Sequence, residues 1–284
     1  MMLKKVYLEI TNVCNCSCAF CPGHKRPKAF MDLAHFAYAA KQVKTVSDFI
    51  YLHVMGEPLL HPKLAELLGI CEEIGLKVII TTNGTLLKEK LDILLSQKAL
   101  HKINISLHSF EANDGMQDES YFENCFFSAR ETASGGIITV LRLWNLDGEL
   151  PGMHRENEYI LDKMKKALPG KWTQNSKGVR ISEKLFLEWG NRFTWPDLSR
   201  APLRQNGSCY GLRDQAGILV DGTVVPCCLD CNGDIALGNV FDMPLAEILN
   251  TKRAVELREG FKKQCYTEPL CKTCGYAGRF SSQK

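Results

Sequence analysis

The sequence of 284 residues lacks the features that would place it in a membrane or on a nucleic acid. It has no run of about 18 apolar residues, which excludes a membrane-spanning helix of ordinary length. Glu9, Thr11 and Asn12 end the first apolar run before it reaches the length of a signal peptide, so we expect no export. A formal net charge of +3 is too small to indicate a nucleic acid or an anionic membrane as a partner. Low-complexity tracts and internal repeats are also missing.

Thiols, by contrast, are plentiful, because the chain has 13 cysteines. A chain of this length buries a sizeable core, so it does not need disulfides to hold its fold. Without an export signal we expect the protein in the reducing cytoplasm, where clustered thiols indicate metal binding or catalysis.

Short apolar or β-branched runs alternate with helical patterns through the first two thirds of the sequence. The expected strands are Val6–Thr11, Phe49–Val54, Lys77–Thr82, Lys102–Leu107, Ile137–Trp144 and Leu185–Glu188. The expected helices are Asp32–Thr45, Lys63–Ile74, Leu87–Leu95, Tyr121–Ala133 and Glu156–Leu168. Six such units in a row predict an α/β fold with parallel strands and crossover helices.

The last third of the sequence reads differently. Two stretches rich in small and polar residues are expected to be connectors: Gln174–Gly178 and Trp195–Gly207. Asp221-Gly222 between Ala216–Val220 and Thr223–Val225 predicts a β-hairpin with a type I′ turn. A helix is expected over Leu245–Arg258. We therefore expect two domains, residues 1–200 and residues 201–284.

Four cysteines lie within eight residues directly after the first strand: Cys14, Cys16, Cys18 and Cys21. So many adjacent thiols cannot all be buried as small apolar side chains, which indicates a soft metal centre. Cys14, Cys18 and Cys21 have the spacing C-x3-C-x2-C. The trio Cys16, Cys18 and Cys21 and a zinc knuckle are alternatives that spacing alone leaves open.

This segment, with the aromatic Phe20 before its last cysteine, resembles the cluster loop of the radical S-adenosylmethionine (SAM) enzymes. The resemblance implies a partial (β/α)6 TIM-like barrel in which Cys14, Cys18 and Cys21 hold a 4Fe-4S cluster, with Cys16 as a bystander. The fourth iron of such a cluster binds SAM, and an electron from the reduced cluster cleaves SAM to a 5′-deoxyadenosyl radical.

The ends of the next strands also resemble the family. Met55-Gly56-Glu57 is similar to its Gly-Gly-Glu segment, so Gly56 and Glu57 are expected at the ammonium group of SAM. The resemblance further implies SAM contacts from Asn83 and Ser106, and from Arg142 to the carboxylate of SAM. All these residues fall at the C-terminal ends of expected strands, the face at which a βα barrel carries its site.

Seven cysteines follow residue 200: Cys209, Cys227, Cys228, Cys231, Cys265, Cys271 and Cys274. The segment from Asp221 to Asp230 resembles the SPASM auxiliary-cluster domain, or its shortened twitch form. The resemblance implies one auxiliary 4Fe-4S cluster with four ligands: Cys209, Cys227, Cys271 and Cys274. A second cluster would need a non-cysteine ligand beside the remaining three thiols. A zinc ribbon of Cys228, Cys231, Cys271 and Cys274 is an alternative.

The two remaining cysteines, Cys71 and Cys125, fall in helical apolar patterns and are predicted to be core residues. Five further residues near expected strand ends are candidates for a substrate pocket: His53, His108, Arg180, Glu188 and Trp189. The pattern names no catalytic acid or base.

An auxiliary cluster beside a substrate takes up one electron, which suits the oxidation of an alcohol. The resemblance covers nearly the whole chain and implies a radical SAM oxidoreductase that dehydrogenates a small polar molecule, such as a sugar or cyclitol, with flavodoxin or ferredoxin as electron donor. One alternative is a maturase that crosslinks, oxidises or epimerises a ribosomal peptide or protein; another is a non-enzymatic zinc or iron-sulfur module. Because only thirteen residues precede Cys14, we expect no separate N-terminal peptide-recognition domain.

Overall fold

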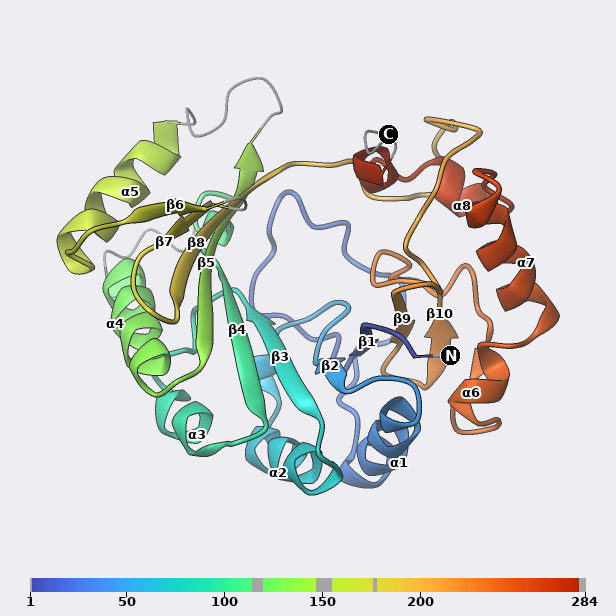
Figure 1. Cartoon of the computed structure of the whole chain (residues 1–284), viewed down its shortest axis with the longest axis horizontal. Coiled ribbons are helices and arrows are strands. Elements are labelled where there is room, and N and C mark those ends of the chain that lie inside the picture. The colour runs from blue at the N-terminus through green and yellow to red at the C-terminus, as the bar shows by residue number, and fades with distance from the viewer. Residues whose placement is uncertain (1, 114–119, 147–154, 176–177, 281–284) are drawn as a thin grey trace.

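The computed structural model describes residues 2–113, 120–146, 155–175 and 178–280. Six parallel strands form a curved sheet in the order β1-β2-β3-β4-β5-β8. They are β1 (Lys5–Leu8), β2 (Phe49–Tyr51), β3 (Lys77–Thr82), β4 (Leu100–Ser106), β5 (Ile138–Leu146) and β8 (Leu185–Asn191). The sheet curls without closing (Figure 1), so the expected partial barrel is confirmed.

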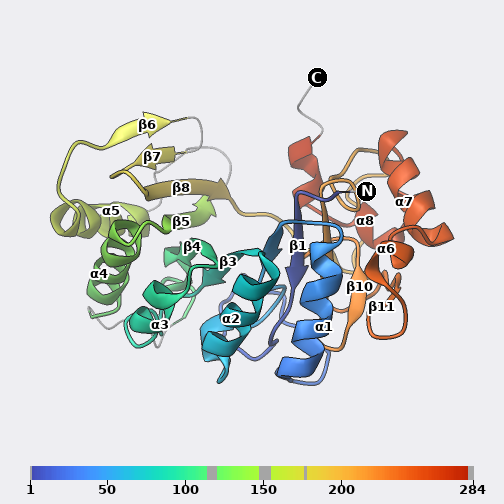
Figure 2. The same cartoon turned by 60° about the horizontal axis from the view of Figure 1, so that its bottom comes forward.

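Helices cover the outer face of this sheet (Figures 1 and 2). They are α1 (Leu33–Lys44), α2 (Leu64–Ile74), α3 (Leu91–Ser96), α4 (Ser120–Ser134) and α5 (Arg155–Ala167), with short 3-10 turns at η1 (Pro58–Leu60) and η2 (Leu107–Ser109). Their apolar faces pack on the strands, and Cys71 and Cys125 are fully buried there, which confirms that they are core residues. Gly75 ends α2 with a left-handed φ of +75°, the conformation that favours glycine at this position.

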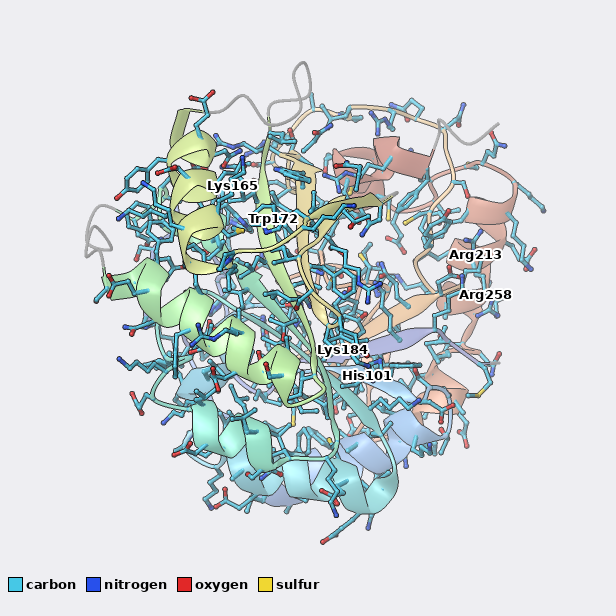
Figure 3. The ribbon with its side chains drawn as sticks, turned by 60° about the vertical axis from the view of Figure 1, so that its left-hand side comes forward. His101, Lys165, Trp172, Lys184, Arg213 and Arg258 are labelled. Carbon is cyan, nitrogen blue, oxygen red and sulfur yellow. The ribbon has the colours of Figure 1, made fainter. Side chains whose placement is uncertain are left out.

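The segment Gln174–Gly178 is not only a connector. Apart from residues 176–177, which lie outside the described residues, it contributes to β6 (Thr173–Asn175) and β7 (Gly178–Arg180), and β7 pairs antiparallel with β8. All three residues of β6 are exposed and polar, so no apolar alternation marks this edge strand. Trp172, just before β6, packs against the core and donates from Nε1 to the Leu168 carbonyl at 3.1 Å (Figure 3).

The remaining chain forms β9 (Gln215–Ile218), β10 (Thr223–Val225), β11 (Gly238–Asn239), α6 (Leu245–Ile248), α7 (Lys252–Lys262), α8 (Pro269–Lys272) and the 3-10 turn η3 (Tyr276–Phe280). Strand β9 runs parallel to β1 over four residue pairs, so the β9–β10 hairpin extends the barrel sheet. Helix α6 lies beside α1, and α7 and α8 lie farther along the outside of that extension (Figures 1 and 2).

Two local predictions in this part are wrong. A type I′ turn needs two positive φ angles, but only Gly222 of the Asp221-Gly222 pair has one, at +87°. The helix expected over Leu245–Arg258 is two helices, α6 and α7. The break has a local cause, because Asn250 and Thr251 donate side-chain hydrogen bonds to backbone carbonyls of α6 at 2.8 and 2.9 Å. Such bonds compete with the continuation of a helix.

A buried carboxylate just beyond β1 joins the two parts of the chain. Glu9 is fully buried, and its Oε1 accepts from Arg26 Nη2 at 2.7 Å and from the Met55 amide at 3.0 Å. Its Oε2 accepts from the Val220 amide at 3.0 Å. Arg26 also donates from Nε to the Cys231 carbonyl at 2.8 Å. One ion pair therefore ties four segments together.

Among the described residues, no helix has the length and apolar character needed to cross a membrane.

We expect Glu9→Gln to lower the free energy of unfolding by about 3–5 kcal/mol, because the change leaves the Arg26 guanidinium buried without a counter-charge. Urea denaturation followed by circular dichroism measures this. Asp48→Asn is the control, because Asp48 is the exposed partner of Lys44 and its loss should leave the free energy nearly unchanged. Equal stability losses in the two variants would contradict the assigned role of Glu9.

Candidate active site

The loop that carries the first four cysteines leaves β1 and returns to start α1. Asn12 closes its base, because its Oδ1 accepts from the Ala29 amide and its Nδ2 donates to the Pro27 carbonyl, both at 2.8 Å. The Met31 amide donates to the Ile10 carbonyl at 2.8 Å beside it. The base is therefore fixed by hydrogen bonds, and the cysteines project from it over the C-terminal ends of the strands.

Three of the four thiols in this loop contact one another. The Cys16 thiol lies between those of Cys14 and Cys18, and its hydrogen bonds lower the pKa of each neighbour to about 6 while raising its own. Side-chain amides point at the same sulfurs: Asn83 Nδ2 lies 3.2 Å from Cys16 Sγ, and Asn113 Nδ2 lies 3.0 Å from Cys18 Sγ. Amide donors around thiolates are a common means of tuning iron-sulfur sites, so the donor set fits such a group.

Cys21 and Phe20 lie at the edge of the group formed by the thiols of Cys14, Cys16 and Cys18. The Cys21 amide donates to the Cys18 carbonyl at 2.9 Å, which turns the chain between these two cysteines. The Cys21 thiol is exposed. Phe20 packs against His108, with 5.0 Å between the ring centroids, and lines a large cavity inside the barrel. The structure therefore places Phe20 at the junction of the cysteine loop and the barrel interior.

Gly56 and Glu57 follow β2 and pack directly against the base of the cysteine loop. A Cβ on Gly56 would lie 2.5 Å from the Thr11 carbonyl oxygen, and the φ of Gly56 is +77°, so only glycine fits there. The Glu57 carboxylate is buried and accepts from the Leu59 amide at 3.0 Å and the Asn83 amide at 2.7 Å. Burial raises the pKa of Glu57 to about 7 against these hydrogen bonds. Glu57 thus holds the β2 and β3 loops together.

Ser106 and Arg142 face the barrel interior from neighbouring strands, where they are a registered pair of β4 and β5. Arg142 Nε lies 3.8 Å from Glu188 Oε2, and its guanidinium stacks on the Trp144 ring at 4.5 Å. Among the pocket candidates, His53 and His108 line the same cavity. Arg180 instead is exposed on β7, and Trp189 packs against the core.

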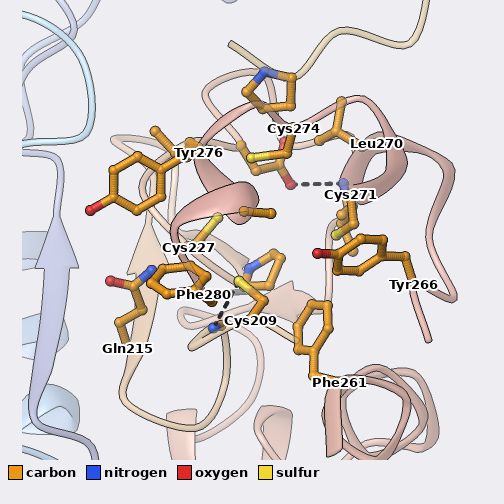
Figure 4. A pocket seen from close by; sticks show the side chains of 17 residues that line it. Cys209, Gln215, Cys227, Phe261, Tyr266, Leu270, Cys271, Cys274, Tyr276 and Phe280 are labelled. Atoms are coloured by element: carbon orange, nitrogen blue, oxygen red, sulfur yellow. Dashed lines mark hydrogen bonds between the residues drawn. The ribbon is translucent and has the colours of Figure 1, made fainter. Parts of the chain in front are cut away.

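The four cysteines expected to bind an auxiliary cluster line one cavity, together with Phe261 and Tyr266 (Figure 4): Cys209, Cys227, Cys271 and Cys274. They come from three separate segments, before β9, after β10 and around α8. Burial raises the pKa of all four thiols, to about 11 for Cys209. A metal that coordinates the thiolates would offset this penalty.

A half-buried cation beside these thiols, Arg204, makes no ion pair with any described residue. Nη1 of Arg204 makes no hydrogen bond, and the guanidinium fills the space where a Cβ of Gly278 would lie, 2.5 Å from Nη1. The charge of Arg204 favours the thiolate of Cys274. A cluster held by four thiolates is an anion and would supply the missing counter-charge, so the residues present fit such a group.

The other cysteines of this part lie elsewhere. Cys228 lines the large cavity of the barrel, Cys231 packs with Tyr7 and Val54, and Cys265 is exposed. A zinc ribbon would require Cys228 and Cys231 to line the same cavity as Cys271 and Cys274. They do not line it. All thirteen cysteines are free thiols.

The large cavity has a volume of about 490 Å³, within the range of small-molecule sites. Several of its lining residues did not stand out in the sequence: Lys5, Tyr7, Tyr51, Arg192 and Tyr276. A signal for the first two was present. Lys5, Tyr7 and Glu9 alternate with apolar Val6 and Leu8, and in a strand covered by helices outside, the polar positions face the barrel interior.

The cavity and the auxiliary thiol site share a wall. Gln215, Leu229 and Tyr276 line both of them. Cys227 and Cys228 are consecutive, yet the first lines the auxiliary site and the second lines the large cavity. A molecule in the large cavity would therefore lie between the cysteine loop, at Phe20, and the auxiliary thiols.

Comparison with known proteins identifies relatives of both parts. The chain is 23% identical to an S-adenosyl-L-methionine-dependent 2-deoxy-scyllo-inosamine dehydrogenase of Niallia circulans, over 96% of this chain and 93% of the relative. It is 24% identical to the antilisterial bacteriocin subtilosin biosynthesis protein AlbA of Bacillus subtilis, over 95% of this chain and 65% of AlbA.

Solved structures agree in fold. BtrN in complex with AdoMet and 2-DOIA matches with a TM-score of 0.62 at 20% identity, over 96% of this chain and 93% of BtrN. A structure of anSMEcpe with bound AdoMet matches with a TM-score of 0.65 at 16% identity, over 99% of this chain and 88% of that one.

Two family models match the chain, and together they cover more than half of it. The model of the radical SAM superfamily matches residues 8–132, and the model of the SPASM iron-sulfur cluster-binding domain matches residues 209–275. The chain therefore belongs to the radical SAM superfamily and carries a SPASM domain.

Proposed function

We propose that the protein is a radical SAM oxidoreductase that dehydrogenates a small polar molecule, such as a sugar or cyclitol, in the large cavity. The observation that supports this most directly is the wall of Gln215, Leu229 and Tyr276 between that cavity and the auxiliary thiols. A substrate in the cavity would have the SAM-binding face of the barrel on one side and an electron acceptor on the other.

The family implies three cofactors: a SAM-binding 4Fe-4S cluster, SAM, and an auxiliary iron-sulfur cluster. When bound, they supply a strong one-electron reductant, the group that abstracts a hydrogen atom, and an electron acceptor. We propose that Cys14, Cys18 and Cys21 hold the first cluster. We assign the auxiliary cluster to Cys209, Cys227, Cys271 and Cys274, and place the domain boundary near residue 200.

The SAM site is proposed at the C-terminal ends of the strands below the cysteine loop. The Gly56 backbone would face the ammonium group of SAM, and Glu57 holds that backbone in place through the Leu59 and Asn83 amides. Asn83, Ser106 and Phe20 border the same face, and Arg142, whose Nε makes no hydrogen bond to a described residue, would bind the carboxylate of SAM.

The number of electrons that a dehydrogenation releases is consistent with this arrangement of the cavity and the auxiliary thiols. When an alcohol carbon becomes a carbonyl, it loses one hydrogen atom, one proton and one electron, so the site needs an acceptor for the single electron. The auxiliary thiols lie one wall away from the cavity, where such an acceptor is required. Similarity to a SAM-dependent dehydrogenase over almost the full length of both chains supports the same reaction class.

Modification of a peptide is the second candidate, because the chain is also similar to the bacteriocin biosynthesis protein AlbA. Flavodoxin or ferredoxin is the proposed electron donor in either case.

The ligand assignment predicts the outcome of cysteine replacement. Protein reconstituted anaerobically should hold about eight irons and should cleave SAM to 5′-deoxyadenosine under reductant. Replacing Cys14, Cys18 and Cys21 by Ala should abolish cleavage and leave about four irons, whereas replacing Cys271 and Cys274 should remove the auxiliary cluster. Iron analysis and chromatography of the adenosine product measure both effects.

Cys16→Ala is the matched control, because Cys16 lies among the same thiols without being assigned as a ligand. It should keep both the iron content and the cleavage of SAM. Loss of cleavage in Cys16→Ala with retention in Cys14→Ala would instead assign the trio Cys16, Cys18 and Cys21.

Product mass tests the reaction class. The reconstituted protein, given SAM, reductant and the small-molecule pool of a cell extract, is expected to convert a metabolite to a product lighter by two hydrogens. Untargeted mass spectrometry detects this product by comparing the reaction of the unaltered protein with that of the variant in which Cys14, Cys18 and Cys21 are replaced by Ala. A product that has the mass of the substrate when formed in H2O, and is one mass unit heavier when formed in D2O, would mean epimerisation. That result would contradict the dehydrogenase.

A further inference from the structure

The side chains that line the large cavity are strongly biased in charge. Three of them are cationic, Lys5, Arg142 and Arg192, and none of the lining residues is Asp or Glu. The rest are mostly aromatic or small. A cavity of this composition has a positive potential, which low-dielectric walls concentrate.

The three cations differ in how they are compensated. Arg192 Nη2 pairs with Glu111 Oε1 at 3.2 Å, and Arg142 Nε lies 3.8 Å from Glu188 Oε2. Lys5 has no ion pair with any described residue. Its ammonium lies over the rings of Tyr7 and Tyr51, 5.2 Å from each centroid. Lys5 is half-buried in the cavity wall and, unlike the two arginines, has no carboxylate at ion-pair distance among the described residues.

The uncompensated polar atoms around the cavity are mainly hydrogen-bond donors. Arg142 Nε and Trp144 Nε1 are buried without a hydrogen-bond partner among the described residues, and both can only donate. The third such atom, His53 Nδ1, belongs to a ring whose pKa burial lowers to about 3, so His53 is neutral. Unpartnered donors and an unpaired cation together require a ligand rich in acceptors and negative charge.

We propose that the substrate of this cavity carries an anionic group, a carboxylate or a phosphate ester, and that Lys5 binds it against Tyr7 and Tyr51. This inference rests on the proposed function, which places the substrate in this cavity. The carboxylate of SAM does not remove the need for such a group, because it is assigned to Arg142 and leaves Lys5 unpaired. An amine substrate, protonated at neutral pH, would instead add a fourth cation.

Calorimetry on the anaerobically reconstituted protein with SAM and without reductant tests this. Four ligands of similar size are compared: D-glucuronate, D-glucose 6-phosphate, D-glucose and D-glucosamine. At least one of the two anions should bind about tenfold or more tightly than both glucose and glucosamine. A preference for glucuronate assigns a carboxylate, and a preference for glucose 6-phosphate assigns a phosphate ester.

Lys5→Met should abolish that preference, because it keeps most of the length of the side chain and removes its charge. Lys4→Met is the matched control, since Lys4 is the adjacent lysine but is exposed and paired with Asp214 at 2.8 Å. It should keep the preference. If Lys5→Met does not fold, the ligand series on the unaltered protein still decides whether the site selects anions.

Three results would overturn the proposal: glucosamine or glucose binding as tightly as the anions, an unchanged preference in Lys5→Met, or binding of none of the four ligands. Because no reductant is present, these results do not depend on turnover. A failure of the dehydrogenase proposal would appear in the product mass instead, so the two failures are distinguishable.

Discussion

The buried ion pair of Glu9 and Arg26 is the constraint on which the arrangement of the site depends. Glu9 lies just beyond the end of β1, and its carboxylate oxygens bind the cysteine loop, the Met55 amide and the Val220 amide. A buried carboxylate must be compensated on all sides, so these partners are held in one geometry. The cysteine loop, the loop after β2 and the SPASM hairpin are therefore positioned relative to one another by a single side chain.

This constraint explains why the auxiliary thiols lie beside the barrel interior. Strand β9 extends the barrel sheet next to β1, and the hairpin that begins with it carries Cys227 and Cys228 at its end. Both cysteines lie in the bend and turn that follow β10, where Cys227 lines the auxiliary site and Cys228 lines the large cavity. The continuity of the sheet thus brings the two sites to a shared wall, with Leu229 and Tyr276 facing both.

Much of the scaffold could be predicted from the sequence, because it depends on local periodicity. The six parallel strands and five crossover helices follow from alternating apolar runs, and the pattern predicts β3 at its observed bounds, Lys77–Thr82. The buried positions of Cys71 and Cys125 follow from helical apolar spacing. Periodicity does not reveal the side-chain hydrogen bonds of Asn250 and Thr251 that end α6, nor the polar edge strand β6, which has no apolar face. The contacts of Glu9 with Arg26 and Val220 could not be inferred, because residues up to 211 positions apart meet only in the folded chain. For the same reason the cationic lining of the cavity became visible only when Lys5, Arg142 and Arg192 were placed together.

The central claim is that two iron-sulfur sites, one on the cysteine loop and one on the SPASM thiols, flank a single substrate cavity. Anomalous X-ray diffraction at the iron edge, from crystals of anaerobically reconstituted protein, tests it most directly. The account predicts two separate iron peaks on opposite sides of the large cavity, one at Cys14, Cys18 and Cys21 and one at Cys209, Cys227, Cys271 and Cys274. A single iron peak, or a zinc signal at Cys228, Cys231, Cys271 and Cys274, would contradict it.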